Sequence, residues 1–363
     1  MIIEELLQRL NELAPFSQAY EWDNVGLLVG DAKREVRRVL ITLDVTFQAI
    51  QKALELGANV ILSHHPVIFH SLNSITDPLL LSLIENHLNA IAMHTNLDVA
   101  PQGANYALAK VLGLENLEPL SSEQGEKWFH LSVTVPPGYT ENVADAVFKA
   151  GGGKVGNYIY CSTRHPIKGT FKPIGEARPF ISSNEEDKIT QVAEEELEFM
   201  VQESRLFDVV SAIKISHPYE TPLIYYFAVA TPQPLFGLGM RGILPEPLPL
   251  SEMLSWIKDK LGCPNPKLWT AGLPLSTPIK KIAVCGGSGS SLIKVAEQSA
   301  ELYITGDIGY HSLLEAKIPM VDAGHFYTEY PVLEVLNQQL IHWNLESYVL
   351  PIEECEYWQN THS

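Results

Sequence analysis

Asn59-Val60-Ile61-Leu62-Ser63-His64-His65-Pro66 is the stretch that decides the fold, because an apolar run ends there in two adjacent histidines and a proline. A short apolar run with this ending predicts a buried strand that has stopped before Pro66. Neutral imidazole is the commonest metal ligand, and adjacent histidines at a strand end can turn toward different ions. The pair therefore indicates a metal centre, provided that other parts of the chain supply further ligands.

Two further segments end an apolar run in groups that can bind metal. In the segment 91–98 a short apolar run ends in polar groups that can bind metal, and Asp98 lies at a passage from strand to helix. Near the C-terminus, 319–324 has the pattern of a strand and turn, and His325 and Glu329 follow, four residues apart, so on a helix they share a face. The candidate ligands are His64, His65, Asp98, His325 and Glu329. Five ligands are too many for one closed tetrahedral site and suit two divalent ions bridged by a carboxylate.

Strand and helix patterns alternate at both ends of the chain. In the first part we expect helices at 3–13, 48–56, 79–85 and 103–109 and strands at 39–43, 60–63 and 90–93. After about residue 236 we expect helices at 250–261, 292–298, 310–316 and a long one to about 342, with strands at 281–285, 302–305 and 320–322. The alternation predicts a split α/β domain with a largely parallel or mixed sheet, in which ligands gather beyond the carboxyl ends of strands. The metal centre is then expected between the two halves.

The middle of the chain has a different order of elements. We expect strands at 128–135, 158–162, 195–201 and 224–230 and helices at 142–149 and 206–215. Strand, helix, strand, strand, helix, strand is the order of a ferredoxin-like α+β unit. The turn-rich segments 121–125 and 231–234 mark its expected borders. We therefore predict an α/β domain of residues 1–125 and 235–363, interrupted by an inserted ferredoxin-like domain at 126–234.

Five motifs follow one another along nearly the whole chain. They are Trp22-Asp23-Asn24-Val25-Gly26-Leu27, Ser63-His64-His65-Pro66, His94-Thr95-Asn96-Leu97-Asp98, Thr305-Gly306-Asp307 with His311, and Gly324-His325 with Glu329. Together they resemble the signature segments of the NIF-three-like family, which is also labelled GTP cyclohydrolase 1 type 2 homologs. The resemblance implies a dinuclear metal site on the five candidate ligands and a toroidal homohexamer. It leaves the reaction unsettled.

The segment His217-Pro218-Tyr219-Glu220-Thr221-Pro222 is similar to the insert, related to PII and CutA proteins, of longer family members. By analogy, the insert could cap the openings of the ring and restrict access or bind a regulator. We interpret His217 as a turn residue that hydrogen-bonds its neighbours, in preference to a metal ligand.

Other residues of these motifs are expected near the metals. The resemblance implies substrate-contact or ligand-supporting roles for Trp22, Asp23, Asn24, His94 and Asn96. Asp307 and His311 are candidates for proton transfer, although Asp307 could equally be a helix cap. Cys285-Gly286-Gly287-Ser288-Gly289-Ser290 lies between a strand and a helix, so the amides of Gly286, Gly287, Ser288 and Gly289 could receive the phosphate of a small anionic ligand; a tight structural turn is the alternative.

Composition limits the class of protein. A chain of 363 residues with 46% hydrophobic and 19% charged residues has the material for two folded domains, and no segment approaches the ~20 apolar residues that span a bilayer. A net charge of -18 argues against a broad phosphate-backbone footprint, and hence against nucleic-acid binding. The four cysteines have no paired spacing, and the acidic N-terminal segment lacks the pattern of a secretory signal, so we expect free thiols and a cytoplasmic protein.

Hydrolysis is the leading expectation for function. Two divalent ions can hold a bridging water, lower its pKa and stabilise an in-line displacement, which suits a phosphate-containing or nucleotide-like small molecule. Zinc, manganese and iron all accept histidine and carboxylate ligands, so the metal stays open. The alternative is a noncatalytic metal-dependent scaffold, metal chaperone or regulatory binding protein.

Overall fold

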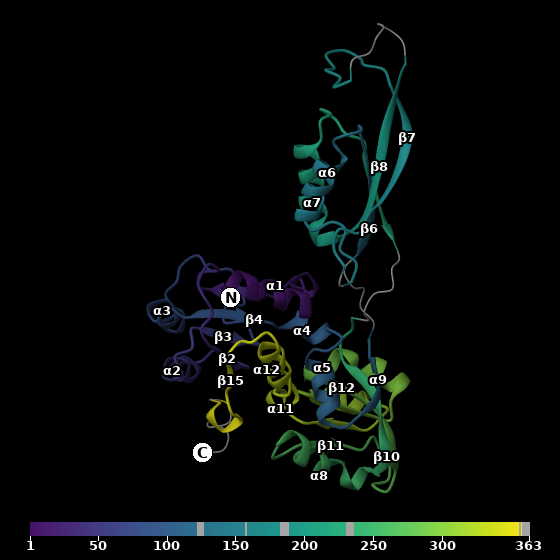
Figure 1. The fold of residues 1–363 in the computed structure, drawn as a ribbon. Coiled ribbons are helices and arrows are strands. Elements are labelled where there is room, and N and C mark those ends of the chain that lie inside the picture. Colours follow the sequence, from purple (N-terminus) through teal and green to yellow (C-terminus); the bar gives the residue numbers. More distant parts are fainter. Residues whose placement is uncertain (122–126, 157, 182–188, 230–235, 356, 358–363) are drawn as a thin grey trace. The chain divides into compact units, whose positions relative to one another are not determined.

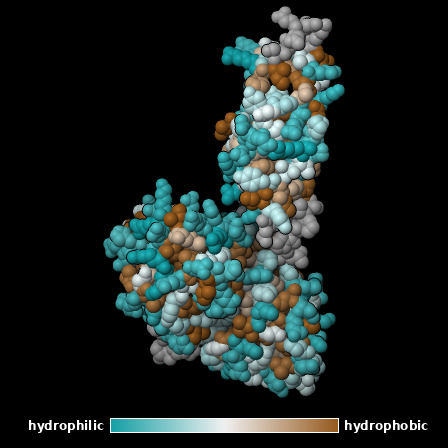
Figure 2. Space-filling view, in the orientation of Figure 1, coloured by the Kyte–Doolittle hydropathy of each residue, from teal (hydrophilic) through white to brown (hydrophobic). Residues whose placement is uncertain are grey.

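The structure is a computed structural model and describes residues 1–121, 127–156, 158–181, 189–229, 236–355 and 357. The chain forms two compact units, Met1–Gln124 with Pro234–Ser363, and Gly125–Gln233. The predicted borders at 121–125 and 231–234 lie almost entirely outside the described residues, so the domain limits stay a prediction. No helix in the described ranges is long and apolar enough to cross a membrane. The face drawn in Figure 2 mixes hydrophilic and hydrophobic side chains.

The first unit holds a five-stranded sheet in the order β1-β4-β3-β2-β15 (Figure 1). The strands are β1 (Gly26–Val29), β2 (Val39–Thr42), β3 (Val60–Ser63), β4 (Asn89–Ala92) and β15 (Ser347–Val349). All pairs are parallel except β1 with β4. The helices of this half are α1 (Ile3–Leu13), α2 (Phe47–Glu55), α3 (Pro78–Glu85), α4 (Thr95–Val99) and α5 (Ala104–Val111). Every residue of β2, β3 and β4 is buried, which explains why three of the four residues in each strand are apolar.

A second sheet, of six strands, has the order β11-β14-β13-β12-β10-β5. Its strands are β5 (Glu115–Pro119), β10 (Met240–Pro249), β11 (Lys267–Trp269), β12 (Pro278–Ser288), β13 (Leu302–Gly306) and β14 (Met320–Asp322). β12, β13 and β14 are parallel, and the outer strands are antiparallel. Helices α8 (Leu250–Leu261), α9 (Ile293–Ser299), α10 (Tyr310–Glu315), α11 (His325–Glu329) and α12 (Val332–His342) belong to this half. The sequence predicts one mixed sheet, whereas the structure has one in each half.

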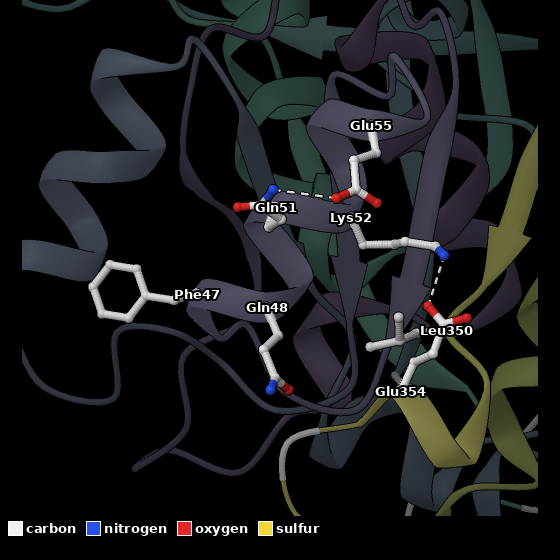
Figure 3. Close-up of a pocket in the computed structure, with 7 residues that line it drawn as sticks. All are labelled: Phe47, Gln48, Gln51, Lys52, Glu55, Leu350 and Glu354. Atoms are coloured by element: carbon white, nitrogen blue, oxygen red, sulfur yellow. Dashed lines mark hydrogen bonds and ion pairs between the residues drawn. The ribbon is translucent and has the colours of Figure 1, made fainter. Parts of the chain in front are cut away.

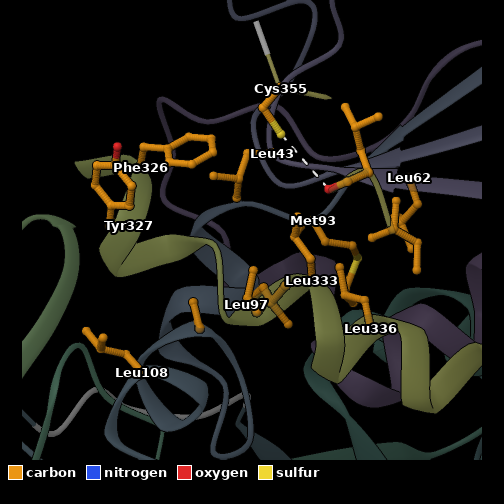
Figure 4. Packing of buried hydrophobic residues seen from close by; sticks show 14 of the residues in the cluster. Leu43, Leu62, Met93, Leu97, Leu108, Phe326, Tyr327, Leu333, Leu336 and Cys355 are labelled. Atoms are coloured by element: carbon orange, nitrogen blue, oxygen red, sulfur yellow. Dashed lines mark hydrogen bonds between the residues drawn. The ribbon is translucent and has the colours of Figure 1, made fainter. Parts of the chain in front are cut away.

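The two halves exchange edge strands. β5, from the first half, pairs with β10 of the second sheet, and β15, near the C-terminus, pairs with β2 of the first (Figure 1). One apolar cluster includes residues of both halves. Leu62 and Met93 of the first half and Leu333 and Leu336 of α12 are among the side chains packed together in Figure 4. The halves therefore share a core, and residues from both can be held at fixed distances.

The second unit has its own sheet and core. Its elements are β6 (Trp128–Val135), α6 (Thr140–Lys149), β7 (Thr163–Phe171), β8 (Thr190–Gln202), α7 (Glu203–Ser216) and β9 (Ile224–Val229), and its sheet is antiparallel in the order β7-β8-β6-β9. His217 Nε2 lies 2.8 Å from the Thr134 carbonyl oxygen, and the Tyr219 amide donates to Nδ1 at 3.0 Å. Both ring nitrogens are thus hydrogen-bonded, which confirms the interpretation of His217 as a structural turn residue.

Two predicted elements are wrong. Residues 158–162 precede the strand, which begins at Thr163, and Tyr160 has a φ of +62° that no strand accommodates. The long C-terminal helix is two helices, because Tyr330 and Pro331 separate α11 from α12 and a proline cannot donate the hydrogen bond that would continue α11. This break leaves α11 free to take its own direction.

Removing part of the shared core should destabilise the first unit. Leu336→Ala deletes a fully buried side chain of α12, and we expect a loss of about 2–5 kcal/mol in the free energy of unfolding, measured by chemical denaturation. Ile341→Ala, on the same helix but exposed, is the matched control and should change stability by about 0.5 kcal/mol or less. Equal effects of the two variants would contradict the proposed core.

Candidate metal centre

Polar side chains of both halves meet where the parallel strands end. His64 and His65 directly follow β3, and His94 lies two residues beyond β4. In the second sheet, Asp307 directly follows β13, and a two-residue turn after β14 leads to His325, the first residue of α11. This is the edge at which open α/β sheets collect ligands. Each half contributes side chains that follow two neighbouring parallel strands, β3 and β4 in the first sheet and β13 and β14 in the second.

Glu329 lies among histidines from both halves. Its Oε2 is 2.9 Å from Nε2 of His65, and its Oε1 is 3.1 Å from Nε2 of His325. Nε2 of His64 lies 3.8 Å from the same Oε1 and 3.5 Å from Oδ1 of Asp98. The structure therefore brings together all five residues that the sequence nominates as ligands, with Glu329 at the middle of the set.

Acidic residues orient two of these imidazoles through their second nitrogen. Nδ1 of His65 donates to Oδ1 of Asp44 at 2.8 Å, and Nδ1 of His325 donates to Oδ2 of Asp307 at 2.6 Å. In metal sites, a carboxylate on the far nitrogen of a histidine fixes the ring and its tautomer and makes the other nitrogen a better ligand. The arrangement therefore aims both Nε2 atoms at Glu329.

His64 supplies the most specific sign that the centre suits a cation. Its Nδ1 lies 2.8 Å from the Met93 carbonyl oxygen, which can only accept, so Nδ1 carries the proton. Its Nε2 is fully buried and has no hydrogen-bond partner among the described residues, although it faces Asp98 and Glu329. A buried polar atom without a partner is costly, and a metal ion would satisfy the lone pair and both carboxylates. The donor set fits a divalent transition metal.

The pKa values of His65, His325 and Glu329 also show that the centre requires positive charge. Burial opposes protonation of His65, but hydrogen bonds to Asp44 and Glu329 raise its pKa to about 10. The hydrogen bond to Glu329 raises the pKa of His325 to about 9. Burial alone would raise the pKa of Glu329, but hydrogen bonds from His325 and its neighbours hold it well below its usual range. Protons thus supply the positive charge that the buried carboxylates require, and a cation would supply the same charge.

His94 forms a second group at the centre. Its Nδ1 donates to Oδ1 of Asp23 at 2.8 Å, and Asp23 also accepts from the amide of Thr95 at 3.0 Å. Burial would raise the pKa of Asp23, but hydrogen bonds from His94 and Thr95 lower it to about 2. His64, His65 and His94 can each present one ligand atom within 4.8 Å of the other two, as can His65, His325 and Glu329. The two groups share His65.

The side chains of Asn24 and Asn96 hydrogen-bond to backbone groups of nearby loops. Asn24 Nδ2 donates to the Ile68 carbonyl oxygen at 2.6 Å, which joins the loop before β1 to the loop after β3. Asn96 is fully buried, accepts from the His94 amide at 3.0 Å and donates to the Ala14 carbonyl oxygen at 2.8 Å. Asn96 therefore shapes the turn that carries His94 and is not free for a substrate.

Asp307 and His311 have different surroundings. Asp307 does not cap α10, whose N-cap residue is Gly309, and its carboxylate holds His325 instead. Its φ of +54° is strained for a residue other than glycine, and such strain concentrates at functional sites. His311 is exposed, and its ring contacts Tyr310 at 5.4 Å between centroids. The structure gives no support to His311 as a proton-transfer residue.

The Gly-Ser loop at 286–289 has its amides engaged inside the protein. Three of its N–H groups donate to side-chain oxygens, in the pairs Gly286 with Asn105 (2.8 Å), Gly287 with Thr328 (3.0 Å) and Gly289 with Thr305 (2.9 Å). These amides therefore cannot receive a phosphate as the sequence allows. The tight structural turn is not found either, because Gly286, Gly287 and Ser288 end β12, where the pairing with β13 is irregular and Gly287 has a φ of +61°.

Glycines let the loops approach α11 closely. A Cβ atom on Gly287 would lie 2.2 Å from Oε1 of Glu329, and one on Gly306 would lie 2.5 Å from the backbone nitrogen of His325. Both distances are impossible for a side chain without movement. The glycines thus fix where the helix that carries His325 and Glu329 can lie.

A hollow of about 370 Å³ lies beside α2 (Figure 3). Its lining residues are Phe47, Gln48, Gln51, Lys52, Glu55, Leu350 and Glu354. Lys52 is the one cation among these seven, and it pairs with Glu354 at 2.7 Å. The hollow shares no residue with the metal centre and offers no unpaired charge to an anion.

Two features of the centre go beyond the sequence analysis. Asp44 is not predicted, although an acidic residue just after the apolar run 39–43 is the same signal that identifies His64. His94 is expected only to line the site, whereas the structure groups it with His64 and His65. The sequence feature that could have identified His94 as a ligand is its position just after the end of β4, because His64 and His65 hold the corresponding position after β3.

Comparison with known proteins gives consistent matches over almost the whole chain. Residues 1–356 match the family model Duf34/NIF3 (NGG1p interacting factor 3). A GTP cyclohydrolase 1 type 2 homolog of Staphylococcus epidermidis is 38% identical over 351 residues, 94% of each chain, and one of Staphylococcus aureus is 37% identical over 362 residues, 97% of each. The crystal structure of a Bacillus cereus protein related to NIF3 has a TM-score of 0.73 at 30% identity and covers 96% of each chain.

Filling the space beside α11 should disturb the centre. Gly306 does not need a positive φ, so Gly306→Ala tests close approach alone, and we expect a loss of about 1–3 kcal/mol in stability together with weaker metal binding. Gly309→Ala is the control, because the nearest atom to its Cβ is Ser312 Oγ at 3.9 Å. Thermal unfolding and metal titration measure both effects. A Gly306→Ala protein as stable as the control, with unchanged metal affinity, would show that α11 has room to move.

Proposed function

The chain belongs to the Duf34/NIF3 family, and from this premise we propose that it is a metal-dependent hydrolase with a centre for two divalent ions. The observation that carries the proposal is the position of Glu329, whose two oxygens face imidazoles from the two halves of the unit. A carboxylate that faces ligands on both sides suits a bridge between two ions.

The ligands of the proposed centre are His64, His65, Asp98, His325 and Glu329. The short contacts among these side chains and the unpartnered Nε2 of His64 support this set. His94, whose Nδ1 is held by Asp23, is a further candidate because its Nε2 is left for the centre. Zinc, manganese and iron are the metals that this mixture of imidazole and carboxylate accepts.

Divalent ions held here would supply Lewis acidity, which activates water and stabilises developing negative charge on a substrate oxygen. The chain's own contribution is orientation. Asp44 and the Met93 carbonyl fix two imidazoles, and Asp307, through Nδ1 of His325, fixes a third. Asp307 is therefore a positioning residue in this scheme. If the five ligands hold the ions without His94, its Nε2 is left for proton transfer, because His94 faces the centre and the carboxylate of Asp23 sets its tautomer.

We propose further that the unit Gly125–Gln233 is an inserted ferredoxin-like domain of the PII/CutA type. The order of its elements and the antiparallel sheet β7-β8-β6-β9 support this assignment. The resemblance to longer family members also supports a homohexameric ring. Light scattering of the purified protein measures the number of subunits.

Replacing the Glu329 carboxylate should weaken metal binding and turnover together. We expect reconstituted wild-type protein to hold two ions per chain and Glu329→Gln to hold fewer, with affinity reduced at least ~10-fold, because the charged carboxylate that would help to hold the ions is lost. Glu334→Gln, exposed on α12, is the control and should behave as wild type. Elemental analysis and a screen of nucleotides and phosphoesters provide the measurements.

The two parts of the proposal have separate outcomes. Turnover by metal-free protein would refute the metal-dependent mechanism. Two bound ions without turnover of any substrate would favour the noncatalytic scaffold or binding protein.

The role of Asp44 as an orienting residue is also testable. Asp44→Asn keeps the size of the side chain but weakens the hydrogen bond from His65 Nδ1, so we expect metal affinity to fall about 10- to 100-fold. Asp259→Asn, exposed on α8, is the control for loss of one negative charge. Metal titration by calorimetry distinguishes the variants. Equal affinity in Asp44→Asn and Asp259→Asn would remove Asp44 from the centre.

A further inference from the structure

Two exposed aromatic rings lie directly beside the candidate metal centre. Trp22 has 60% of its surface exposed and Phe69 has 46%. Each ring meets His94 in an edge-to-face contact, at 6.0 Å and 5.9 Å between centroids. His94 in turn contacts the rings of His64 and His65 at 5.3 Å and 5.5 Å. The aromatic surface is therefore continuous with the candidate ligands.

The chain holds both rings in place through their neighbours. Asp23, next to Trp22, accepts hydrogen bonds from His94 and Thr95. Asn24 donates to the carbonyl oxygen of Ile68, the residue before Phe69. Exposed apolar side chains are scattered over the face drawn in Figure 2, so exposure alone says little. Trp22 and Phe69 differ from the other exposed apolar residues in two ways. Both contact His94 of the centre, and residues next to or near them in sequence are fixed by hydrogen bonds.

The centre offers a ligand no surplus of positive charge. The carboxylates of the centre are those of Asp23, Asp44, Asp98, Asp307 and Glu329. Among the described residues, the ion pairs recorded for these five groups are all with histidines. Two divalent ions carry four positive charges against five carboxylates, so no surplus of positive charge would remain to hold the rest of a ligand. Contact with aromatic faces is a source of affinity that needs no positive charge.

We propose that Trp22 and Phe69 bind a planar aromatic or heteroaromatic ring of the substrate beside His94. This inference rests on the proposed metal-dependent function and specifies its substrate class: a molecule with a flat ring at one end and, within reach of the ions, a group that is hydrolysed. Stacking suits such a ring because it requires a π-face and no particular hydrogen-bonding pattern. A ligand without a ring cannot make this stacking contact.

Binding of matched probes to the metal-loaded full chain tests the inference. The probes are guanosine 5′-monophosphate, adenosine 5′-monophosphate and pterin, with ribose 5-phosphate as the ligand that lacks a ring. We expect at least one ring-bearing probe to bind more tightly than ribose 5-phosphate. Trp22→Ala and Phe69→Ala should each weaken ring binding by about 5- to 100-fold and leave ribose 5-phosphate unchanged. Trp22→Phe should restore part of the affinity.

Phe47→Ala is the matched control, because Phe47 is 57% exposed but lines the hollow at α2. Calorimetry gives the affinities, thermal unfolding shows that each variant is folded, and light scattering shows whether its assembly changes. The inference is overturned if no ring-bearing probe binds more tightly than ribose 5-phosphate at millimolar concentration. It is also overturned if Trp22→Ala and Phe69→Ala change only the assembly.

Metal content separates this inference from the proposed function. Two bound ions without selective ring binding would overturn the inference and leave the metal centre intact. Selective ring binding by a protein that takes up no metal would support the ring site and contradict the metal-dependent function.

Discussion

The buried carboxylate of Glu329 is the constraint on which the centre depends. Transfer of a charged carboxylate out of water is unfavourable unless positive charge and hydrogen bonds compensate it. Here compensation comes from His65 of the first half and His325 of the second, while His64 keeps an unpartnered nitrogen beside it. A divalent cation held by these residues would supply the same compensation.

The fold provides this arrangement by joining two similar halves. Each has parallel strands whose carboxyl ends lie at the centre, and the exchange of β5 and β15 joins the two sheets through a shared core. Gly287 and Gly306 then allow α11 to lie against the second sheet. A side chain at either glycine would push α11 away, so the centre depends on the absence of side chains as much as on the ligands.

The sequence predicts the buried parallel strands well, and it singles out five candidate ligands whose side chains lie close together in the structure. β3 and β14 are apolar except for their last residues, Ser63 and Asp322, and the predicted bounds at 60–63 and 320–322 match the structure. Since parallel strands place their ends at one edge, the ligands that follow them could be grouped from spacing alone. The sequence analysis does not predict the edge strands β1, β5, β11 and β15, because each has three to five residues and depends on pairing with a distant segment. It also misses β10, which lies inside the second sheet between β12 and β5. The close approach at Gly306 and the engaged amides at 286–289 are likewise tertiary effects that no local pattern shows.

Anomalous diffraction from crystals of the metal-reconstituted protein tests the central claim most directly. Data collected on either side of the zinc, iron and manganese edges identify each ion and its position. The account predicts two anomalous peaks on opposite sides of the Glu329 carboxylate, one within coordination distance of His64 Nε2 and the other of His325 Nε2. A fully reconstituted crystal with no peak there, and with Glu329 still hydrogen-bonded to protonated histidines, would contradict it.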